Sequence, residues 1–232
     1  MTSSPRPPAD AATSSRRSRG RPAVPLERIT ATALQIVDEE GAEALSMRTL
    51  AQRLESSTAT LYRHFANRAE LATHVADRVF GEVDLDLEAL ASMGWEKACR
   101  TVAHSMFDVL GRHHKVAALL VSHAPIGPHA LRLRERCLAV LLDSGFPPHT
   151  AARAYAALAR FVLGFAIQLT GTTDASEEQR LAAVFRDLSA TDFPATHAVA
   201  ESLPVPLEEE FAFGLDLLVD GLRQARHHGR SS

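Results

Sequence analysis

Residues 57–64, with the sequence STATLYRH, carry side chains suited to contacting nucleic acid. They combine small hydroxyl and methyl groups with a phenol and two basic groups. Ser57 is a predicted N-cap for a helix that runs from Thr58 to about His64. Short polar and cationic groups on a protruding helix can reach base edges and phosphates in the DNA major groove. The stretch therefore predicts a helix that reads DNA.

Neighbouring helices are predicted to position this reading helix. Ser46 can cap a helix that ends near Leu54, and Asn67 with Glu70 has the capping-box spacing at the start of a longer helix to about residue 80. A first helix is predicted over residues 26–40, where apolar residues recur at helical spacing before Gly41. The shared core of the two short helices would contain Leu50, Leu54 and Leu61. This arrangement is a helix-turn-helix inside a three-helix head.

The predicted DNA contacts divide by position along these helices. Residues at the start of the reading helix face base edges, and Arg48 in the preceding helix can join them. Tyr62, His64 and Arg68 are placed for phosphates, which set register and affinity but carry no sequence information. Arg68 also stands at a helix N-terminus, where backbone N–H groups attract anions. The predicted set is Arg48, Ser57, Thr58, Ala59, Thr60, Tyr62, Arg63, His64 and Arg68.

Residues 45–71, LSMRTLAQRLESSTATLYRHFANRAEL, resemble the DNA-binding segment of the tetracycline-repressor (TetR) family. The LYRHF core, the preceding Ser-Thr-Ala-Thr and the cation at Arg68 match that family's pattern. Glu55 departs from it, because the family usually has glycine at this turn residue, which takes a left-handed conformation. A residue with a side chain costs roughly 1–2 kcal/mol there. Ser56 likewise replaces a small apolar residue, but the reading helix itself is unaffected.

The first 24 residues are predicted to form a basic arm that is disordered without DNA. Five arginines against one aspartate leave it a local charge of +4 in a chain whose formal net charge is −3. Within it, Arg19 and Arg21 flank Gly20 in an RGRP core that resembles AT-hook peptides. Two interpretations stay open. The arginines insert into a narrow A·T minor groove, or the arm is a solvated tail that adds only phosphate attraction.

Composition excludes several classes of protein for this chain of 232 residues. No apolar run approaches the ~20 residues of a membrane span, and the N-terminus lacks the apolar core of a secretory signal. Cys99 and Cys137 suggest neither a disulfide framework nor a metal site, which fits the cytoplasm. The adjacent pairs His113-His114 and His227-His228 suit joint chelation poorly. With no phosphate loop or nucleophile elbow, we expect no enzyme, no metal and no cofactor.

From residue 94 to residue 226 every long segment is helical in period, so the fold class is all-α. A linking helix would join the head to a C-terminal helical-bundle domain. The predicted organisation is a basic arm at 1–24, a DNA-binding domain at 25–71, a ligand-binding and dimerisation domain at 72–226 and a tail at 227–232. The predicted body segments are helices at 95–109, 116–121, 128–143, 150–169 with Thr150 as cap, 177–188 and 208–226, an acidic connection at 81–92 and a proline-punctuated loop at 192–206.

The body also resembles the tetracycline-repressor type of all-α domain, through ADR at 76–78, GF at 145–146, VLGF at 162–165 and EFAFGL at 210–215. The resemblance implies that helices 150–169 and 208–226 pair with their symmetry mates in a dimer. The alternative is that both helices only complete the core of one protomer. The interface residues implied are Tyr155, Leu158, Phe161, Val162, Phe165, Phe211, Leu215, Leu218 and Leu222.

The same resemblance implies a ligand pocket. Its predicted lining residues are Phe80, Val102, Met106, Leu119, Leu120 and Cys137. The histidine and amide groups that chelate a magnesium–tetracycline complex are absent from these places, so tetracycline is not expected. A cavity of this composition would suit a small hydrophobic effector, with His104 as one polar group. The alternative is that these residues are plain core.

Together these patterns predict a homodimeric transcriptional repressor that a small effector releases from a palindromic, double-stranded operator. Two other classes stay open at this point. One is an architectural DNA binder without an effector, which the RGRP arm permits. The other is a helical small-molecule-binding protein or enzyme whose head no longer binds DNA, for which Glu55 in the turn is the one hint.

Overall fold

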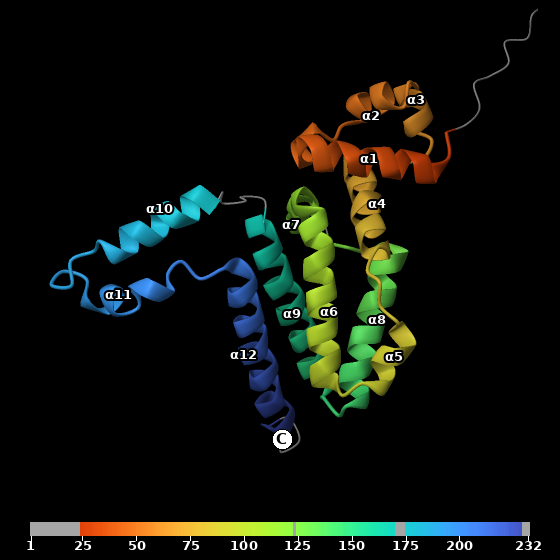
Figure 1. Ribbon diagram of the computed structural model, residues 1–232. Coiled ribbons are helices and arrows are strands. Elements are labelled where there is room, and N and C mark those ends of the chain that lie inside the picture. The colour runs from red at the N-terminus through yellow and green to blue at the C-terminus, as the bar shows by residue number, and fades with distance from the viewer. Residues whose placement is uncertain (1–23, 123, 170–174, 229–232) are drawn as a thin grey trace, which may run out of the picture.

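The computed structural model describes residues 24–122, 124–169 and 175–228, so Arg19, Arg21 and the other arginines of the basic arm lie outside the described residues (Figure 1). In this part of the chain every regular element is helical, which confirms the all-α class. The head and linking helix comprise α1 (Leu26–Glu40), η1 (Ala42–Ala44), α2 (Met47–Arg53), α3 (Thr58–Leu61) and α4 (Arg68–Gly81). Helix α4 runs from the head down into the body (Figure 1).

The body is a bundle in which α6, α8, α9 and α12 run roughly alongside one another, while α10 and α11 form an arm beyond α12 (Figure 1). Its elements are α5 (Leu87–Ser92), α6 (Trp95–Arg112), η2 (His114–Val116), α7 (Ala117–Ser122), α8 (Pro128–Asp143), α9 (Pro148–Gln168), α10 (Ala175–Arg186), α11 (Pro194–Ala198), η4 (Ala200–Ser202) and α12 (Leu207–His228). Helix α9 packs against α6, α7, α8 and α12 and is the central helix of the bundle.

Local capping produces the head as predicted. Ser46 Oγ accepts a hydrogen bond from the Thr49 N–H at 3.0 Å, and Ser57 Oγ accepts one from the Thr60 N–H at 3.2 Å. Asn67 caps α4 through the Glu70 N–H at 3.0 Å. The Glu70 carboxylate returns the bond to the Ala66 N–H at 2.6 Å instead of to the cap residue itself. These bonds satisfy N–H groups that a helix start leaves without partners.

The turn between α2 and α3 has the left-handed residue that the resemblance implied. Glu55 has a φ of 48°, and it is the one residue other than glycine with positive φ in the described part of the chain. The turn is closed by the Ser56 N–H, which donates to the Ala51 carbonyl at 2.8 Å. The chain therefore bears the conformational cost that glycine would avoid.

Replacing this residue should stabilise the protein. Glu55→Gly is expected to raise the free energy of unfolding by about 1 kcal/mol, because glycine adopts positive φ without the Cβ penalty. Thermal denaturation measures the change as a rise of about 2–4 °C in Tm. Gly41→Ala is the matched control and should lower the Tm. Gly41 has a φ of 94°, so an alanine there would destabilise the protein. A fall in Tm for Glu55→Gly would contradict this account of the turn.

Some predicted boundaries are wrong. Thr150 does not cap a helix, because α9 already begins at Pro148, whose missing N–H suits a first turn. The predicted loop at 192–206 contains α11 and η4. The connection at 81–92, for which no structure was predicted, contains α5, capped by Asp86. Helix α3 ends at Leu61 rather than near His64. These differences lie at helix ends and in short elements, which depend on a few competing hydrogen bonds.

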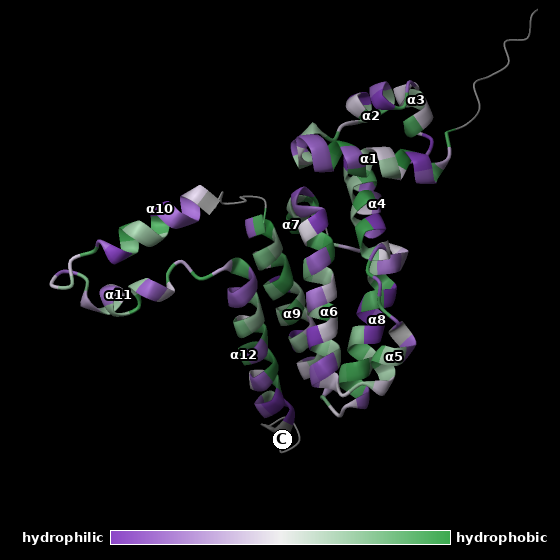
Figure 2. Ribbon diagram, in the orientation of Figure 1, coloured by the Kyte–Doolittle hydropathy of each residue, from purple (hydrophilic) through white to green (hydrophobic). Residues whose placement is uncertain are grey.

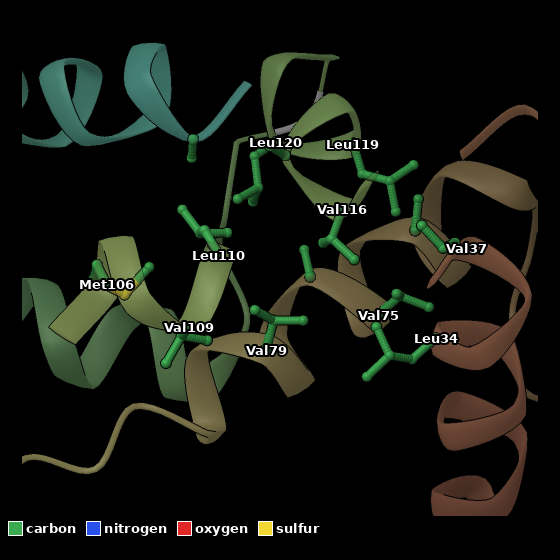
Figure 3. Close-up of a cluster of buried hydrophobic side chains, with 14 of the residues drawn as sticks. Leu34, Val37, Val75, Val79, Met106, Val109, Leu110, Val116, Leu119 and Leu120 are labelled. Atoms are coloured by element: carbon green, nitrogen blue, oxygen red, sulfur yellow. The ribbon is translucent and has the colours of Figure 1, made fainter. Parts of the chain in front are cut away.

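One continuous core joins the head to the body. Figure 3 shows Leu34 and Val37 of α1 meeting Val75 of α4, while Val79 lies beside Val109 of α6. All five are buried. Since α4 contributes to both ends of this core, a displacement of α4 within the body must move the head with it.

Helix α9 is apolar along most of its length (Figure 2). By length and composition alone it could cross a membrane, and it is the one helix in the described ranges that could. Arg153 and Arg160 interrupt the apolar sequence of this helix, so no continuous apolar run of membrane-spanning length was predicted there. Only a minor part of its apolar window is buried within one chain. Most residues of α9 are therefore not fully buried by the rest of the protomer.

Candidate DNA-binding and ligand-binding sites

The predicted reading surface lies at the end of the head farthest from the body, on α2 and α3 (Figure 1). Beneath it, Leu61 and Phe65 are fully buried and fix the orientation of α3. Tyr62 is 55% exposed, an unusual exposure for a large aromatic side chain unless it serves a contact. The exposed members of the predicted set are Arg48, Ser57, Thr58, Ala59, Tyr62 and Arg63, and the half-buried ones are Thr60 and His64.

Arg68, for which the sequence predicts a phosphate contact, forms hydrogen bonds within the head. Its Nε donates to the Leu45 carbonyl at 2.6 Å, and its Nη2 donates to the Ala42 carbonyl at 2.7 Å. The guanidinium is half-buried and turned toward the segment that connects α1 to α2. Arg68 thus ties the start of α4 to the interior of the head. The sequence could not reveal this, because the two partners precede Arg68 by more than 20 residues.

A cavity of about 670 Å³ lies in the body, within the size range of small-molecule sites. Five of the six predicted residues line it, namely Phe80, Val102, Met106, Leu120 and Cys137. Leu119 does not line it. Its buried side chain lies toward Val37 of the head (Figure 3), because consecutive residues of a helix point about 100° apart. His104 is also absent from the lining and packs edge-on against Phe211, with ring centroids 5.3 Å apart.

The polar groups of this cavity are almost all basic. Its lining contains Arg134, Arg136 and Arg160, together with the phenol of Tyr155, and no aspartate or glutamate. Burial raises the pKa of the Cys99 thiol to about 11 and that of Cys137 to about 12, so neither thiol carries a negative charge at neutral pH. Sequence reasoning missed the arginines, because the residues that line the cavity depend on how α8 and α9 pack.

Two polar contacts attach α4 to the body beside this cavity. Asp77 of α4 is buried, and its Oδ1 accepts a hydrogen bond from the Ala130 N–H at 2.9 Å, in the first turn of α8. Gly127 lies directly against it, since a Cβ there would come within 2.2 Å of the Asp77 carboxyl carbon. Directly after the C-terminus of α4, His113 bridges Asp38 of α1 and Glu82, each at 2.8 Å. The linking helix is therefore held at two points.

Metal binding has no support from these contacts. No cluster of three histidine, cysteine, aspartate or glutamate side chains suited to a metal ion occurs within the described ranges. His113, one of the adjacent pair noted in the sequence, faces two carboxylates, one in α1 and one directly after α4. Its position indicates a junction between the head, the linking helix and the body.

Some residues predicted for a dimer interface on α9 and α12 do not lie on the exposed faces of these helices. Phe211, Leu215 and Val162 are buried inside the protomer and cannot meet a partner. The exposed apolar side chains of α12 are instead Phe213 and Leu217, 69% and 58% exposed and one helical turn apart. The remaining predicted residues, all half-buried, are Tyr155, Leu158, Phe161, Phe165, Leu218 and Leu222. Tyr155 and Leu158 belong to the cavity lining.

Comparison with known proteins agrees with this geometry. Residues 29–85 match the family described as bacterial regulatory proteins, tetR family, and residues 89–226 match the tetracyclin repressor-like C-terminal domain. The chain is 30% identical over 233 residues to the transcriptional repressor DrrR1 of Streptomyces coeruleorubidus, covering 95% of this chain and 86% of that protein.

Solved structures give the same result. The fold is similar to ActR of Streptomyces coelicolor in complex with (S)-DNPA, with a TM-score of 0.77 and 29% identity, covering 88% of this chain and 98% of that one. It is equally similar to ActR in complex with actinorhodin, with a TM-score of 0.76 and 30% identity over 88% and 99% of the two chains. These neighbours share both the helix-turn-helix head and the helical body.

Proposed function

This chain belongs to the TetR family of bacterial transcriptional regulators, and we propose that it is a homodimeric repressor that a small effector releases from a palindromic operator. The observation that carries the proposal is the pairing of an exposed, capped reading helix with a separate cavity in the body. The first can bind DNA and the second can bind a small molecule. A single linking helix, α4, packs against α1 of the head and contributes Phe80 to the cavity lining.

Dimerisation is proposed through the outer faces of α9 and α12. Phe213 and Leu217 form an exposed apolar pair on α12, and α9 keeps an apolar side that its own chain does not cover. Burying this surface against a second copy would remove it from water. A two-fold dimer would present two reading helices to half-sites about 34–36 Å apart, which doubles the sequence that each head reads alone.

Release from DNA is proposed to act through α4. An effector that fills the cavity contacts Phe80 on α4 as well as residues of α6, α8 and α9. It favours whichever position of α4 gives it the better contacts, and the spacing of the two heads follows. A shift from 1:99 to 99:1 between the two states requires about 5.5 kcal/mol of differential binding. The relative ActR, whose structures include complexes with actinorhodin and with (S)-DNPA, supports a ligand-responsive body.

A footprint of the purified protein on its own upstream DNA, at two salt concentrations, tests the proposal. A protected palindrome that survives physiological salt is the expected result. Smeared protection that disappears with salt would contradict specific repression and favour an architectural binder. No protection at either salt concentration would favour a small-molecule-binding protein whose head no longer binds DNA.

Two substitutions on the reading surface should change DNA binding in different ways. Thr58→Ala is expected to change which operator variant is preferred, with a cost of about 1–3 kcal/mol at the base it contacts, because Thr58 is exposed at the start of α3. Tyr62→Phe, which removes a phosphate donor, should weaken every operator variant alike. Gel-shift titrations against an operator mutant series measure both. An equal, uniform loss for the two variants would contradict the division into base and phosphate contacts.

A further inference from the structure

We infer that the effector of this cavity is an apolar organic anion, such as a carboxylic acid or an acidic phenol, whose charged end binds Arg134 and Tyr155. The inference rests on the proposed function, because it specifies the ligand of the cavity described above. Its starting point is the charge of the lining, which contains three arginines and no carboxylate. The rest of the lining is almost entirely apolar.

Among the three arginines, Arg134 is the one placed to receive the anion. It is half-buried, whereas Arg136 and Arg160 are exposed. Arg160 also bonds back to the Ala156 carbonyl of its own helix at 3.5 Å. Exposed guanidiniums are compensated by water, but a half-buried one loses hydration and gains most from a bound anion.

The present partners of Arg134 are neutral. Its Nε donates to Tyr155 Oη at 3.3 Å, its Nη2 donates to the Pro125 carbonyl at 3.2 Å, and its guanidinium carbon lies 5.7 Å from the Tyr155 ring centroid. No acidic side chain pairs with it in the described part of the chain. A guanidinium carries five N–H donors in a planar fork that fits a carboxylate, so donors remain for a ligand.

Tyr155 completes the anion site. Its oxygen accepts the bond from Arg134, and its own O–H has no acceptor among the described residues. The phenol can therefore donate to the same anion that the guanidinium binds. Charge-assisted bonds of this kind are about twice as strong as neutral ones. The apolar remainder of the ligand would lie against Phe80, Met106 and the neutral thiols of the lining.

Binding at Arg134 would also reach the linking helix. The Pro125 carbonyl that now accepts from Arg134 lies two residues before Gly127, and Gly127 lies against the buried Asp77 of α4. An anion that draws the guanidinium away from this carbonyl loosens the segment that leads into α8. The same residue thus recognises the effector and contacts the segment that supports α4.

A matched pair of fluorescent probes tests the inference with the full-length protein. The anion 8-anilinonaphthalene-1-sulfonate and the neutral N-phenyl-1-naphthylamine differ only in the sulfonate. The wild type should bind the anion more tightly than the neutral probe. Arg134→Met should lower the affinity for the anionic probe by about 10- to 100-fold, the change expected for the loss of one charged hydrogen-bonding group. The affinity for the neutral probe should not change. Tyr155→Phe should weaken the anion several-fold and keep the ring in place.

Arg132→Met is the matched control, because Arg132 is exposed on the same helix and outside the cavity lining. It should leave both probes unchanged. The inference would be overturned if Arg134→Met lowered the affinity for both probes equally. It would also be overturned if Arg132→Met lowered the affinity for the anionic probe as much as Arg134→Met does. If the wild type bound neither probe, the inference would fail together with the effector role of the cavity. Failure of the regulator proposal itself is separate, since it appears as the absence of an operator footprint.

Discussion

Phe211→Ala should lower the free energy of unfolding by about 3–5 kcal/mol, a loss large enough to unfold a marginally stable protein. Phe211 is 1% exposed and stacks on Phe107 with centroids 4.2 Å apart. It also meets Phe161 at 5.4 Å and Phe165 at 5.5 Å. Truncation would leave a cavity where α6, α9 and α12 meet. Urea denaturation at a fixed protein concentration measures the loss, because the stability of a dimer depends on concentration.

A substitution on the other face of the same helix should affect assembly instead. Leu217→Asp places a charge on the exposed apolar pair, so sedimentation equilibrium should show a folded monomer with unchanged helical circular dichroism. Leu131→Asp, the same change at an exposed leucine of α8, should leave the dimer intact. A dimer that survives Leu217→Asp would rule out this face as the dimer interface.

The Phe211 prediction has its own contradicting outcome. Unchanged stability in Phe211→Ala would mean that α12 does not pack as described.

The difference between these two faces also explains where sequence reasoning was limited. The spacing of Phe211, Leu215, Leu218 and Leu222 correctly identified one apolar stripe of a long helix. It could not show that this stripe packs inside the protomer, because a second apolar pair, Phe213 and Leu217, lies on the same helix. Periodicity gives the stripe, whereas the neighbouring helices decide which stripe is covered.

Features set by local hydrogen bonds were predicted well. Ser46, Ser57 and Asn67 each cap the helix that follows by accepting a bond from an N–H group three residues further on. Such bonds involve only neighbours in the sequence, so the pattern contains all the information needed. Arg134 was not predicted. Its role arises only where α8 and α9 converge on one cavity, and nothing within α8 separates it from the other arginines of that helix.

Arg68 has long-range contacts that the sequence could not reveal, and its substitution should have the second large effect. Arg68→Ala is expected to destabilise the head by about 2–4 kcal/mol, because two charge-assisted hydrogen bonds to the Ala42 and Leu45 carbonyls are lost. Hydrogen exchange of the head amides should accelerate accordingly. Operator affinity should fall alike for every sequence, in proportion to the head that is unfolded.

The salt dependence of DNA binding separates this structural role from a phosphate contact. A residue that contacts a phosphate reduces the slope of log K against log salt by about 1 when it is removed. Arg63→Ala is the matched control, because Arg63 is exposed on the reading surface. It should reduce the slope and leave hydrogen exchange in the head unchanged. Arg68→Ala should do the reverse. A reduced slope with unchanged hydrogen exchange in Arg68→Ala would contradict the structural role. It would instead support the phosphate contact predicted from the sequence, which requires the guanidinium to leave the two carbonyls.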